Sequence, residues 1–263
     1  LIQEGLFNVR QSVGIVGYGN IGKRLYQMLS ALNIPVYAHD PFLTDPFVVE
    51  MDKILACDLI TIHVPYSTEG AHPTRELINI SHTKDLQDKI LINTSRGGIV
   101  SEALVMESHD LIYIADVWLN EPTPSPAVIQ KAFIASPHIA GYSIEGKLNG
   151  TSMIAMECAR VFNCIKETSS LENHSIEWPH GLENIVRDMH AFGFPLALFK
   201  SELDLRSISD TLKKIPANEL ADRFKDLRVN HSPRHHFNAY SYQEIVDLDE
   251  SINLTFFNSL KNL

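Results

Sequence analysis

The sequence is poor in cysteine, in long apolar runs and in positive charge. Its three cysteines, Cys57, Cys158 and Cys164, are odd in number and lack Cys-x-x-Cys spacing, which excludes a disulfide framework and a zinc site. No stretch approaches the roughly 18 apolar residues of a membrane span, and the first residues lack the apolar core of a signal peptide. We therefore expect a reducing, cytoplasmic location without a membrane partner, and we expect Cys158 and Cys164 to be buried as small apolar side chains.

Positive charge is outweighed by negative charge across the chain. Lys and Arg total 22 and Asp and Glu total 32, which gives a formal net charge of −10. That sign disfavours a nucleic-acid partner, because binding to phosphate backbones requires a basic surface. With 44% hydrophobic and 21% charged residues, the composition is that of a globular protein. The length of 263 residues allows one large domain or two smaller ones.

Short apolar runs alternate with amphipathic stretches from about residue 12 to 166, a pattern typical of a doubly wound parallel α/β sheet of the Rossmann type. The polar stretch ETSSLENHS then indicates a boundary, so we expect a sheet domain at 1–168 and a small α+β domain at 169–263. The predicted strands of the sheet are 13–16, 35–39, 59–64, 90–93, 111–115 and 133–136. Further predicted elements are helices at 21–31, 101–107, 146–166, 182–190 and 218–227, with strands at 175–178 and 237–242.

A Gly-x-Gly-x-x-Gly motif, made of Gly17, Gly19 and Gly22, follows the first predicted strand and opens a helix. Gly17 permits a tight turn, Gly19 lets the backbone approach a pyrophosphate, and Gly22 allows close packing of helix on strand. Asp40, at the end of the next strand, can accept hydrogen bonds from both hydroxyls of a ribose and would repel a 2'-phosphate. The motif therefore favours NAD over NADP, with an ordinary tight turn as the alternative.

Three polar segments, which contain Arg96, Glu121 and His138, follow later strands and should meet at one edge of the sheet. Arg96 can bind a carboxylate in fork geometry, His138 can take a hydroxyl proton as hydride leaves, and Glu121 can orient the imidazole. This set suits the interconversion of a 2-hydroxy acid and a 2-keto acid, although each residue alone could be structural. We expect no metal, because a site in the histidine-rich stretch 231–236 lacks further ligands at suitable spacing.

The segments CDLITIHVP (57–65), INTSRGGIV (92–100), DVWLNEP (116–122) and SPHIAGY (136–142) occur in this order after the glycine motif. Over residues 10–166 the chain resembles the D-isomer-specific 2-hydroxyacid dehydrogenase family. The resemblance implies a Rossmann fold, NAD as cofactor and a catalytic trio of Arg96, Glu121 and His138. It also implies NAD contacts at Gly17, Gly19, Asn20, Ile21, Gly22, Asp40, Thr94, Ser95, Asp116 and Gly141.

A narrower signature, HIAGYSIEGK (138–147) followed by Gly150 and Thr151, resembles the branch of the family that oxidises 4-phosphoerythronate in pyridoxal phosphate synthesis. It implies a phosphorylated 2-hydroxy acid as substrate, Tyr142 as a substrate contact and a homodimer formed through the C-terminal domain. Another substrate, such as glyoxylate or hydroxypyruvate, and a non-catalytic NAD-binding, dimerising module remain open. Lys147 is a candidate phosphate contact, although a solvated lysine is commoner. Because the family's substrate-binding domain precedes the glycine motif, we expect this chain to be truncated.

Overall fold

A computed structural model describes residues 1–2, 4–162, 182–192, 195, 198, 202–231, 234–235, 240, 243–249, 251–252, 254–255 and 258. The chain forms two compact units by its internal contacts. The first, the sheet unit, comprises residues 1–140 and 205–230, and the second unit comprises residues 141–204 and 231–263. The expected boundary at residue 168 lies outside the described residues, so the division into domains at 1–168 and 169–263 stays a prediction.

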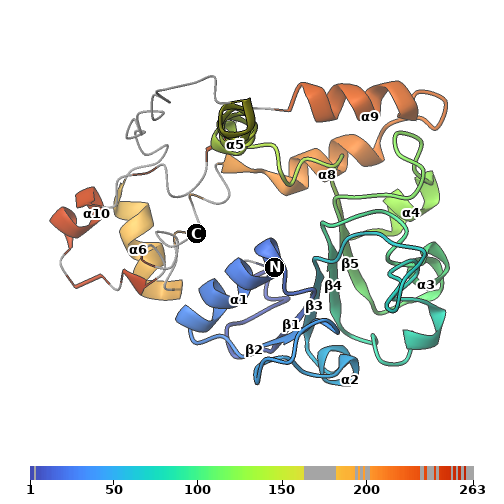
Figure 1. Ribbon diagram of the computed structural model, residues 1–263, viewed down its shortest axis with the longest axis horizontal. Coiled ribbons are helices and arrows are strands. Elements are labelled where there is room, and N and C mark those ends of the chain that lie inside the picture. The colour runs from blue at the N-terminus through green and yellow to red at the C-terminus, as the bar shows by residue number, and fades with distance from the viewer. Residues whose placement is uncertain are drawn as a thin grey trace. The chain divides into compact units, whose positions relative to one another are not determined.

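Six parallel strands in the order β2-β1-β3-β4-β5-β6 form the sheet unit's centre (Figure 1). β1 lies between β2 and β3, with Val13 beside Val36 and Leu59, so the chain winds outward in both directions from the β1–β3 junction. This confirms the predicted doubly wound fold, and such a junction is where ligands bind in sheets of this kind. The strands are β1 (Val13–Val16), β2 (Val36–His39), β3 (Leu59–Ile62), β4 (Ile90–Asn93), β5 (Ile112–Ala115) and β6 (Ile134–Ala135).

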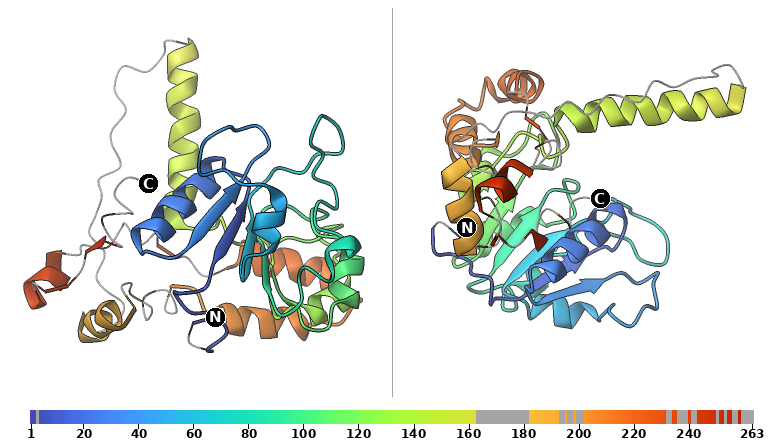
Figure 2. Two further views of the ribbon diagram at one scale, coloured as in Figure 1. Left: turned by 90° about the horizontal axis from the view of Figure 1, so that it is seen from below. Right: turned by 90° about the vertical axis from the view of Figure 1, so that its left-hand side faces the viewer.

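Helices cover both faces of the sheet, which explains why its strands are almost continuously apolar. On one face, Val13 and Ile15 of β1 pack with Leu25 and Leu29 of α1 (Asn20–Ala31). The opposite face carries the larger core cluster, to which α2, α3 and α4 contribute. Figure 2 shows α1 along the sheet from two further sides. The three helices of the larger cluster are α2 (Met51–Leu55), α3 (Glu102–Glu107) and α4 (Pro126–Lys131).

A helix pair from late in the sequence, α8 (Leu205–Lys213) and α9 (Leu220–Val229), completes the sheet unit beside β6 and α4 (Figures 1 and 2). The Ser209 hydroxyl oxygen accepts a hydrogen bond from the Ala135 amide of β6 at 3.0 Å. Leu212, Leu220 and Phe224 are buried in the same cluster as the strands. The pair therefore covers the edge strand, although residues 205–230 follow the stretch in which composition predicts a boundary.

The second unit contains α5 (Ile144–Phe162), α6 (Leu182–Phe192) and α10 (Gln243–Leu248) among its described residues. α6 packs against α10, where Ile185 and Ile245 are buried. These helices agree with the predictions at 146–166 and 182–190, and α10 was not predicted. The predicted strand at 175–178 lies outside the described residues, as does that at 237–242 except for Tyr240.

The structure bears on the expected absence of a membrane span and on the expected burial of the cysteines. No helix in the described part of the chain is both long enough and apolar enough to cross a membrane, and the cytoplasmic location stays a prediction. Cys57 is buried, but Cys158 on α5 is exposed, so the expectation that it is buried was wrong. The expectation assumed that a helix with many apolar residues is packed against the rest of the protein, but none of the residues of α5 is buried. Cys164 lies outside the described residues.

Candidate active site

The glycine motif forms a turn at the β1–β3 junction that leaves little room for side chains. Gly17 has a φ of +95°, and a Cβ atom there would lie 2.8 Å from Val64 Cγ1. A Cβ on Gly22 would lie 1.9 Å from the Gly17 carbonyl oxygen, because helix and turn touch at this point. Gly19 differs, since a Cβ there would meet nothing within 4 Å. Protein packing therefore requires Gly17 and Gly22, whereas the space beside Gly19 is open to a ligand.

The first turn of α1 offers hydrogen-bond donors that the described part of the chain leaves unused. Gly19 is the N-cap and provides no side-chain cap, and the first turn has no acidic residue. The amides of Asn20, Ile21 and Gly22 have no acceptor among the described residues. The positive end of the helix dipole lies at the same place. Three free amides beside the open space at Gly19 therefore suit an anionic group such as a pyrophosphate.

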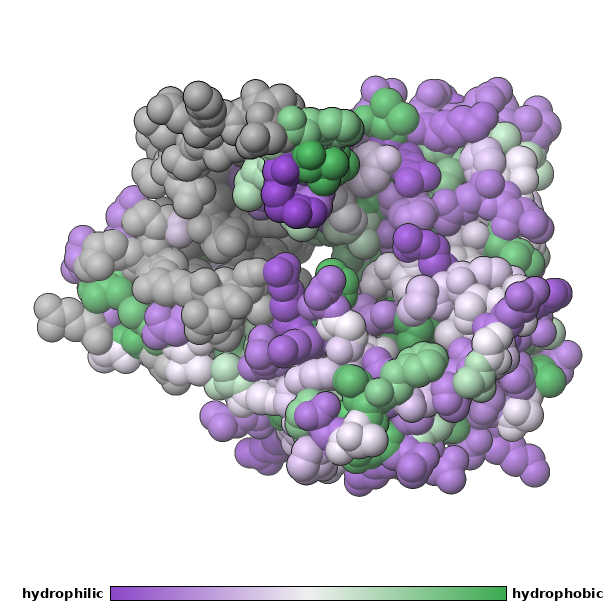
Figure 3. All heavy atoms as spheres, viewed as in Figure 1, coloured by the Kyte–Doolittle hydropathy of each residue, from purple (hydrophilic) through white to green (hydrophobic). Residues whose placement is uncertain are grey.

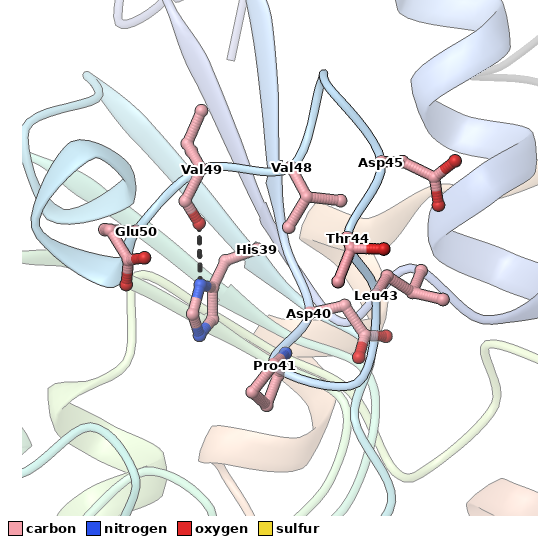
Figure 4. Close-up of a pocket in the computed structure, with 9 residues that line it drawn as sticks. All are labelled: His39, Asp40, Pro41, Leu43, Thr44, Asp45, Val48, Val49 and Glu50. Atoms are coloured by element: carbon pink, nitrogen blue, oxygen red, sulfur yellow. Dashed lines mark hydrogen bonds between the residues drawn. The ribbon is translucent and has the colours of Figure 1, made fainter.

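A pocket of about 410 Å³ lies beyond the end of β2, next to the glycine turn (Figure 4). Asp40 lies in its wall and connects pocket and turn, because its Oδ2 accepts a hydrogen bond from the Tyr18 amide at 3.0 Å. Its Oδ1 accepts one from the Phe42 amide at 3.1 Å. Asp45 and Glu50 add two more carboxylates to the lining, and this acidity would repel a phosphate. The predicted contact between Asp40 and a ribose fits this pocket and stays a prediction.

His63, which follows β3, lies against the glycine turn and was not among the predicted site residues. A Cβ on Gly17 would lie 2.9 Å from its carbonyl oxygen, and its Nε2 lies 3.0 Å from the Thr61 hydroxyl. Burial lowers the pKa of His63 to about 4. The imidazole is therefore neutral at neutral pH and adds no charge at this junction. The sequence signal was a lone histidine after an apolar strand, which is commonly structural.

The turn that carries Arg96 follows β4 and is held by Asn93, a buried residue at the end of that strand. The Asn93 side chain donates a hydrogen bond to the Arg96 carbonyl oxygen at 3.0 Å and accepts one from the Ser95 amide at 3.1 Å. The Ser95 hydroxyl donates to the Val64 carbonyl oxygen. The exposed Arg96 side chain therefore extends from a fixed turn. Its Nη1 donates to the Ser95 carbonyl oxygen at 2.7 Å.

Gly97 connects the Arg96 turn to the loop after β5. A Cβ atom on Gly97 would lie 1.9 Å from the Trp118 carbonyl oxygen and 2.7 Å from the Leu119 amide nitrogen. No larger residue could replace it without separating the two loops. The Arg96 turn and the loop that contains Glu121 thus pack backbone against backbone.

Glu121 and His138 form the closest pair of predicted catalytic residues. His138 Nδ1 lies 2.7 Å from Glu121 Oε2, and Glu121 Oε1 accepts a hydrogen bond from the Trp118 amide at 2.9 Å. Burial opposes ionisation of Glu121, but these hydrogen bonds and the charges of His138 and Arg228 outweigh it and lower its pKa. An ionised Glu121 keeps the proton of a neutral His138 on Nδ1. His138 Nε2 has no partner among the described residues and can accept a proton.

Asp116, at the end of β5, fixes the loop on both sides of His138. Its Oδ1 accepts hydrogen bonds from the Ser136 hydroxyl at 2.6 Å and the Ile139 amide at 2.8 Å, and its Oδ2 accepts one from the Ala140 amide at 2.9 Å. His138 has a φ of +57°, a conformation that few non-glycine residues adopt. The buried carboxylate holds the backbone in this conformation. Its predicted contact with NAD stays a prediction.

The structure brings most of the predicted site residues to the carboxyl ends of neighbouring strands. Arg96 follows β4, Glu121 follows β5 and His138 follows β6, with Thr94 and Ser95 in the Arg96 turn. The two remaining residues, Gly141 and Tyr142, belong to the second unit. There, Lys147 Nζ lies 4.4 Å from the centre of the Tyr142 ring. Asn93, Trp118 and His63 take part in the site and were not predicted.

Comparisons with known proteins agree with this geometry. Residues 5–140 match the family model described as D-isomer specific 2-hydroxyacid dehydrogenase, NAD binding domain. An erythronate-4-phosphate dehydrogenase of Cellvibrio japonicus is 39% identical over 155 residues, which are 56% of this chain and 41% of that protein. One of Shewanella sp. is 34% identical over 256 residues, 93% of this chain and 67% of that protein. An NAD⁺-bound 3-phosphoglycerate dehydrogenase of Entamoeba histolytica is 26% identical with a TM-score of 0.51, covering 60% of this chain and 54% of that chain.

The fold, the glycine turn and the free amides of α1 define a dinucleotide-binding domain of a dehydrogenase, with NAD as its cofactor. The chain belongs to the D-isomer specific 2-hydroxyacid dehydrogenase family. It spans 41% of the length of the Cellvibrio japonicus relative.

A valine at position 19 should block the cofactor without disturbing the fold. Gly19 has a φ of −75° and open space around it, so Gly19→Val should leave the thermal unfolding midpoint within about 2 °C of the parent. The added side chain should occupy the approach to the α1 amides and weaken NAD binding by at least about tenfold, measured by isothermal titration calorimetry. Lys23→Val, at an exposed position on the same helix, is the control. Undiminished NAD binding by Gly19→Val would contradict the cofactor assignment.

Proposed function

We propose that the protein to which this chain belongs oxidises a 2-hydroxy acid to the 2-keto acid. The observation that carries the proposal is the Glu121–His138 pair, at 2.7 Å, with Nε2 of His138 left to accept a proton at the strand ends. A base is needed because the hydroxyl must lose its proton as the carbon loses hydride. The family resemblance supports the same roles.

Each residue of the trio has a role that follows from its chemistry. The exposed guanidinium of Arg96 binds the substrate carboxylate in fork geometry and orients the molecule. His138 Nε2 removes the hydroxyl proton, and Glu121 stabilises the imidazolium that results. NAD, when bound, supplies the hydride acceptor. The amides of α1 and the carboxylate of Asp40 hold this cofactor in the proposal.

The substrate in this proposal is 4-phosphoerythronate, which places the enzyme in pyridoxal phosphate synthesis. Two observations support it. Relatives bearing the name erythronate-4-phosphate dehydrogenase match over as much as 94% of this chain, well beyond the segment matched by the family model. Tyr142 and Lys147, whose ring and ammonium group lie 4.4 Å apart, provide an aromatic surface and a cation shortly after His138 in sequence. We assign substrate contact to Tyr142 and phosphate contact to Lys147.

Substitutions in the trio should separate the three roles in the proposed reaction. His138→Gln should lower kcat at least about a thousandfold, because it removes the base, with NAD binding unchanged. Arg96→Gln should raise KM for the hydroxy acid about tenfold or more, because it removes the fork. Glu121→Gln should lower kcat and move the acid limb of the pH profile to lower pH, since the carboxylate no longer stabilises the imidazolium. Steady-state NADH formation measures all three.

The phosphate group should determine which hydroxy acid the enzyme prefers. We expect kcat/KM for 4-phosphoerythronate to exceed that for the unphosphorylated acid by at least about a hundredfold, and hydroxypyruvate with NADH to be reduced poorly. Lys147→Met should narrow this ratio, whereas Lys131→Met, at a comparable exposed lysine in the sheet unit, should not. Equal kcat/KM values for the two acids would contradict the proposal that the substrate is phosphorylated. Absence of NADH formation with every acid would favour a non-catalytic NAD-binding module.

We also propose that the protein is a homodimer and that α5 contributes to the interface. None of the helix's residues is buried, although it carries many large apolar side chains. Figure 3 shows apolar side chains, in green, gathered over the end of α5 that faces the viewer in Figure 1. Monomeric proteins seldom expose so many neighbouring apolar groups. The large exposed apolar residues of α5 are Leu148, Met153, Ile154, Met156, Val161 and Phe162.

A charge on this helix should break the dimer. Met153 and Ile154 are 69% and 68% exposed, so replacing both with Glu should leave each folded chain intact and prevent its burial against a second copy. Sedimentation velocity should show a dimer for the parent and a monomer for the double variant. Asn149→Glu, which adds a charge at another exposed position of α5, serves as the control. A double variant that remains dimeric would show that the interface lies elsewhere.

A further inference from the structure

Arg228, on α9, lies against the catalytic carboxylate from a part of the chain that the family model does not match. Its Nη1 is 3.9 Å from Glu121 Oε2, the oxygen that lies 2.7 Å from His138 Nδ1. One oxygen atom thus has a guanidinium and an imidazole as neighbours. The family model ends at residue 140, and neither the sequence motifs nor the fold class assign any role to Arg228.

The position of Arg228 follows from the packing of α9. Phe224 is 1% exposed and belongs to the main core cluster, and Arg228 lies four residues later on the same face of the helix. Leu220, four residues before Phe224, is also buried. The helix is therefore anchored along this face, and α8 before it is bonded to β6 through Ser209. A core-packed helix holds a charged group more firmly than a loop does.

Burial makes the charge of Arg228 effective at Glu121. The side chains of Arg228, Glu121 and His138 are 35%, 19% and 27% exposed, so water screens their interaction only in part. In the described part of the chain, the charged or titratable groups that act on Glu121 are His138, from the loop after β6, and Arg228, from α9. Both lower the pKa of its carboxyl group, against the opposing effect of burial. Arg228 keeps Glu121 ionised, but it also repels a positive charge on His138.

We propose that Arg228 is a positioning residue that limits how strongly Glu121 holds the proton on His138. With two cations beside one carboxylate, the imidazolium gains less from Glu121 than it would alone. Arg228 thereby offsets part of the attraction between Glu121 and a proton on His138, which keeps the proposed base available during oxidation. This role rests on the proposed function, in which His138 is the base. Removing the charge of Arg228 should shift the ionisation of His138 to higher pH, the direction opposite to that of Glu121→Gln.

The first test follows the ionisation of His138 directly and needs no catalysis. In the full chain, the imidazole carbon-bound protons are titrated by NMR, and the His138 signal is assigned by its loss in His138→Gln. We expect Arg228→Met to move the titration midpoint of His138 upward by about half a pH unit. Arg228→Lys, which keeps the charge, should return the midpoint toward that of the parent. Arg223→Met, at an exposed arginine of the same helix, should leave it unchanged.

The second test measures the pH profile of kcat/KM in the active enzyme. Arg228→Met should move the acid limb upward by the same half unit, with KM for NAD and for the hydroxy acid within about twofold of the parent. If Arg228→Met does not fold, Arg228→Gln removes the charge with a polar side chain and is judged by the same criteria. An unchanged or lowered midpoint in the NMR titration would overturn the proposal. So would a raised KM for the hydroxy acid with an unchanged midpoint, which would make Arg228 a substrate contact.

The two tests also separate this inference from the proposed function. If the protein oxidises no 2-hydroxy acid but the His138 midpoint shifts as expected, the electrostatic role of Arg228 stands and the catalytic proposal fails. If the protein is an active dehydrogenase and the midpoint does not move, the catalytic proposal stands and the role of Arg228 fails.

Discussion

The hydrogen bond between Glu121 and His138 is the interaction on which the geometry of the candidate active site depends. It joins side chains from two different loops, after β5 and after β6, and at 2.7 Å it tolerates little displacement of either loop. The parallel register of Ala115 with Ala135 sets the two strand ends side by side. The fold therefore fixes the distance between the imidazole and the carboxylate, which is the preorganisation that the proposed proton transfer at His138 requires.

Buried polar groups, rather than further apolar packing, keep the loops of the candidate active site in place. Asp116 accepts hydrogen bonds on both sides of His138. Asn93 holds the Arg96 turn by donating one hydrogen bond and accepting another. Trp118 connects the two, since its indole nitrogen donates to the Ser136 carbonyl oxygen at 2.9 Å and its own carbonyl oxygen faces Gly97. Each of these groups would be costly to leave without a partner in the interior, so the loops have few alternative arrangements. Gly97 also keeps these loops in place, because it lets its backbone contact the backbone at Trp118.

Local signals predicted much of this arrangement. All six strands of the sheet were predicted within two residues of their observed ends, because apolar runs buried on both faces stand out from their Gly, Pro and Asp boundaries. The meeting of Glu121 with His138 followed from the rule that parallel strands end at one edge. α8 was missed although its few apolar residues, such as Ile208 and Leu212, are placed at helical spacing in a mostly polar segment. Arg228 could not be placed from sequence at all, since its contact with Glu121 depends on a long-range return of the chain to the sheet.

In the proposed mechanism, Glu121 holds His138 with its proton on Nδ1 and leaves Nε2 to accept the proton of the substrate. The most direct test is the tautomer of His138, read from the ¹⁵N chemical shifts and the two-bond couplings of its imidazole ring in the folded protein at a pH where the ring is neutral. We expect a protonated Nδ1 and an unprotonated Nε2, and in Glu121→Gln a loss of this preference. A neutral ring with its proton on Nε2 in the parent protein would exclude Nε2 as the proton acceptor.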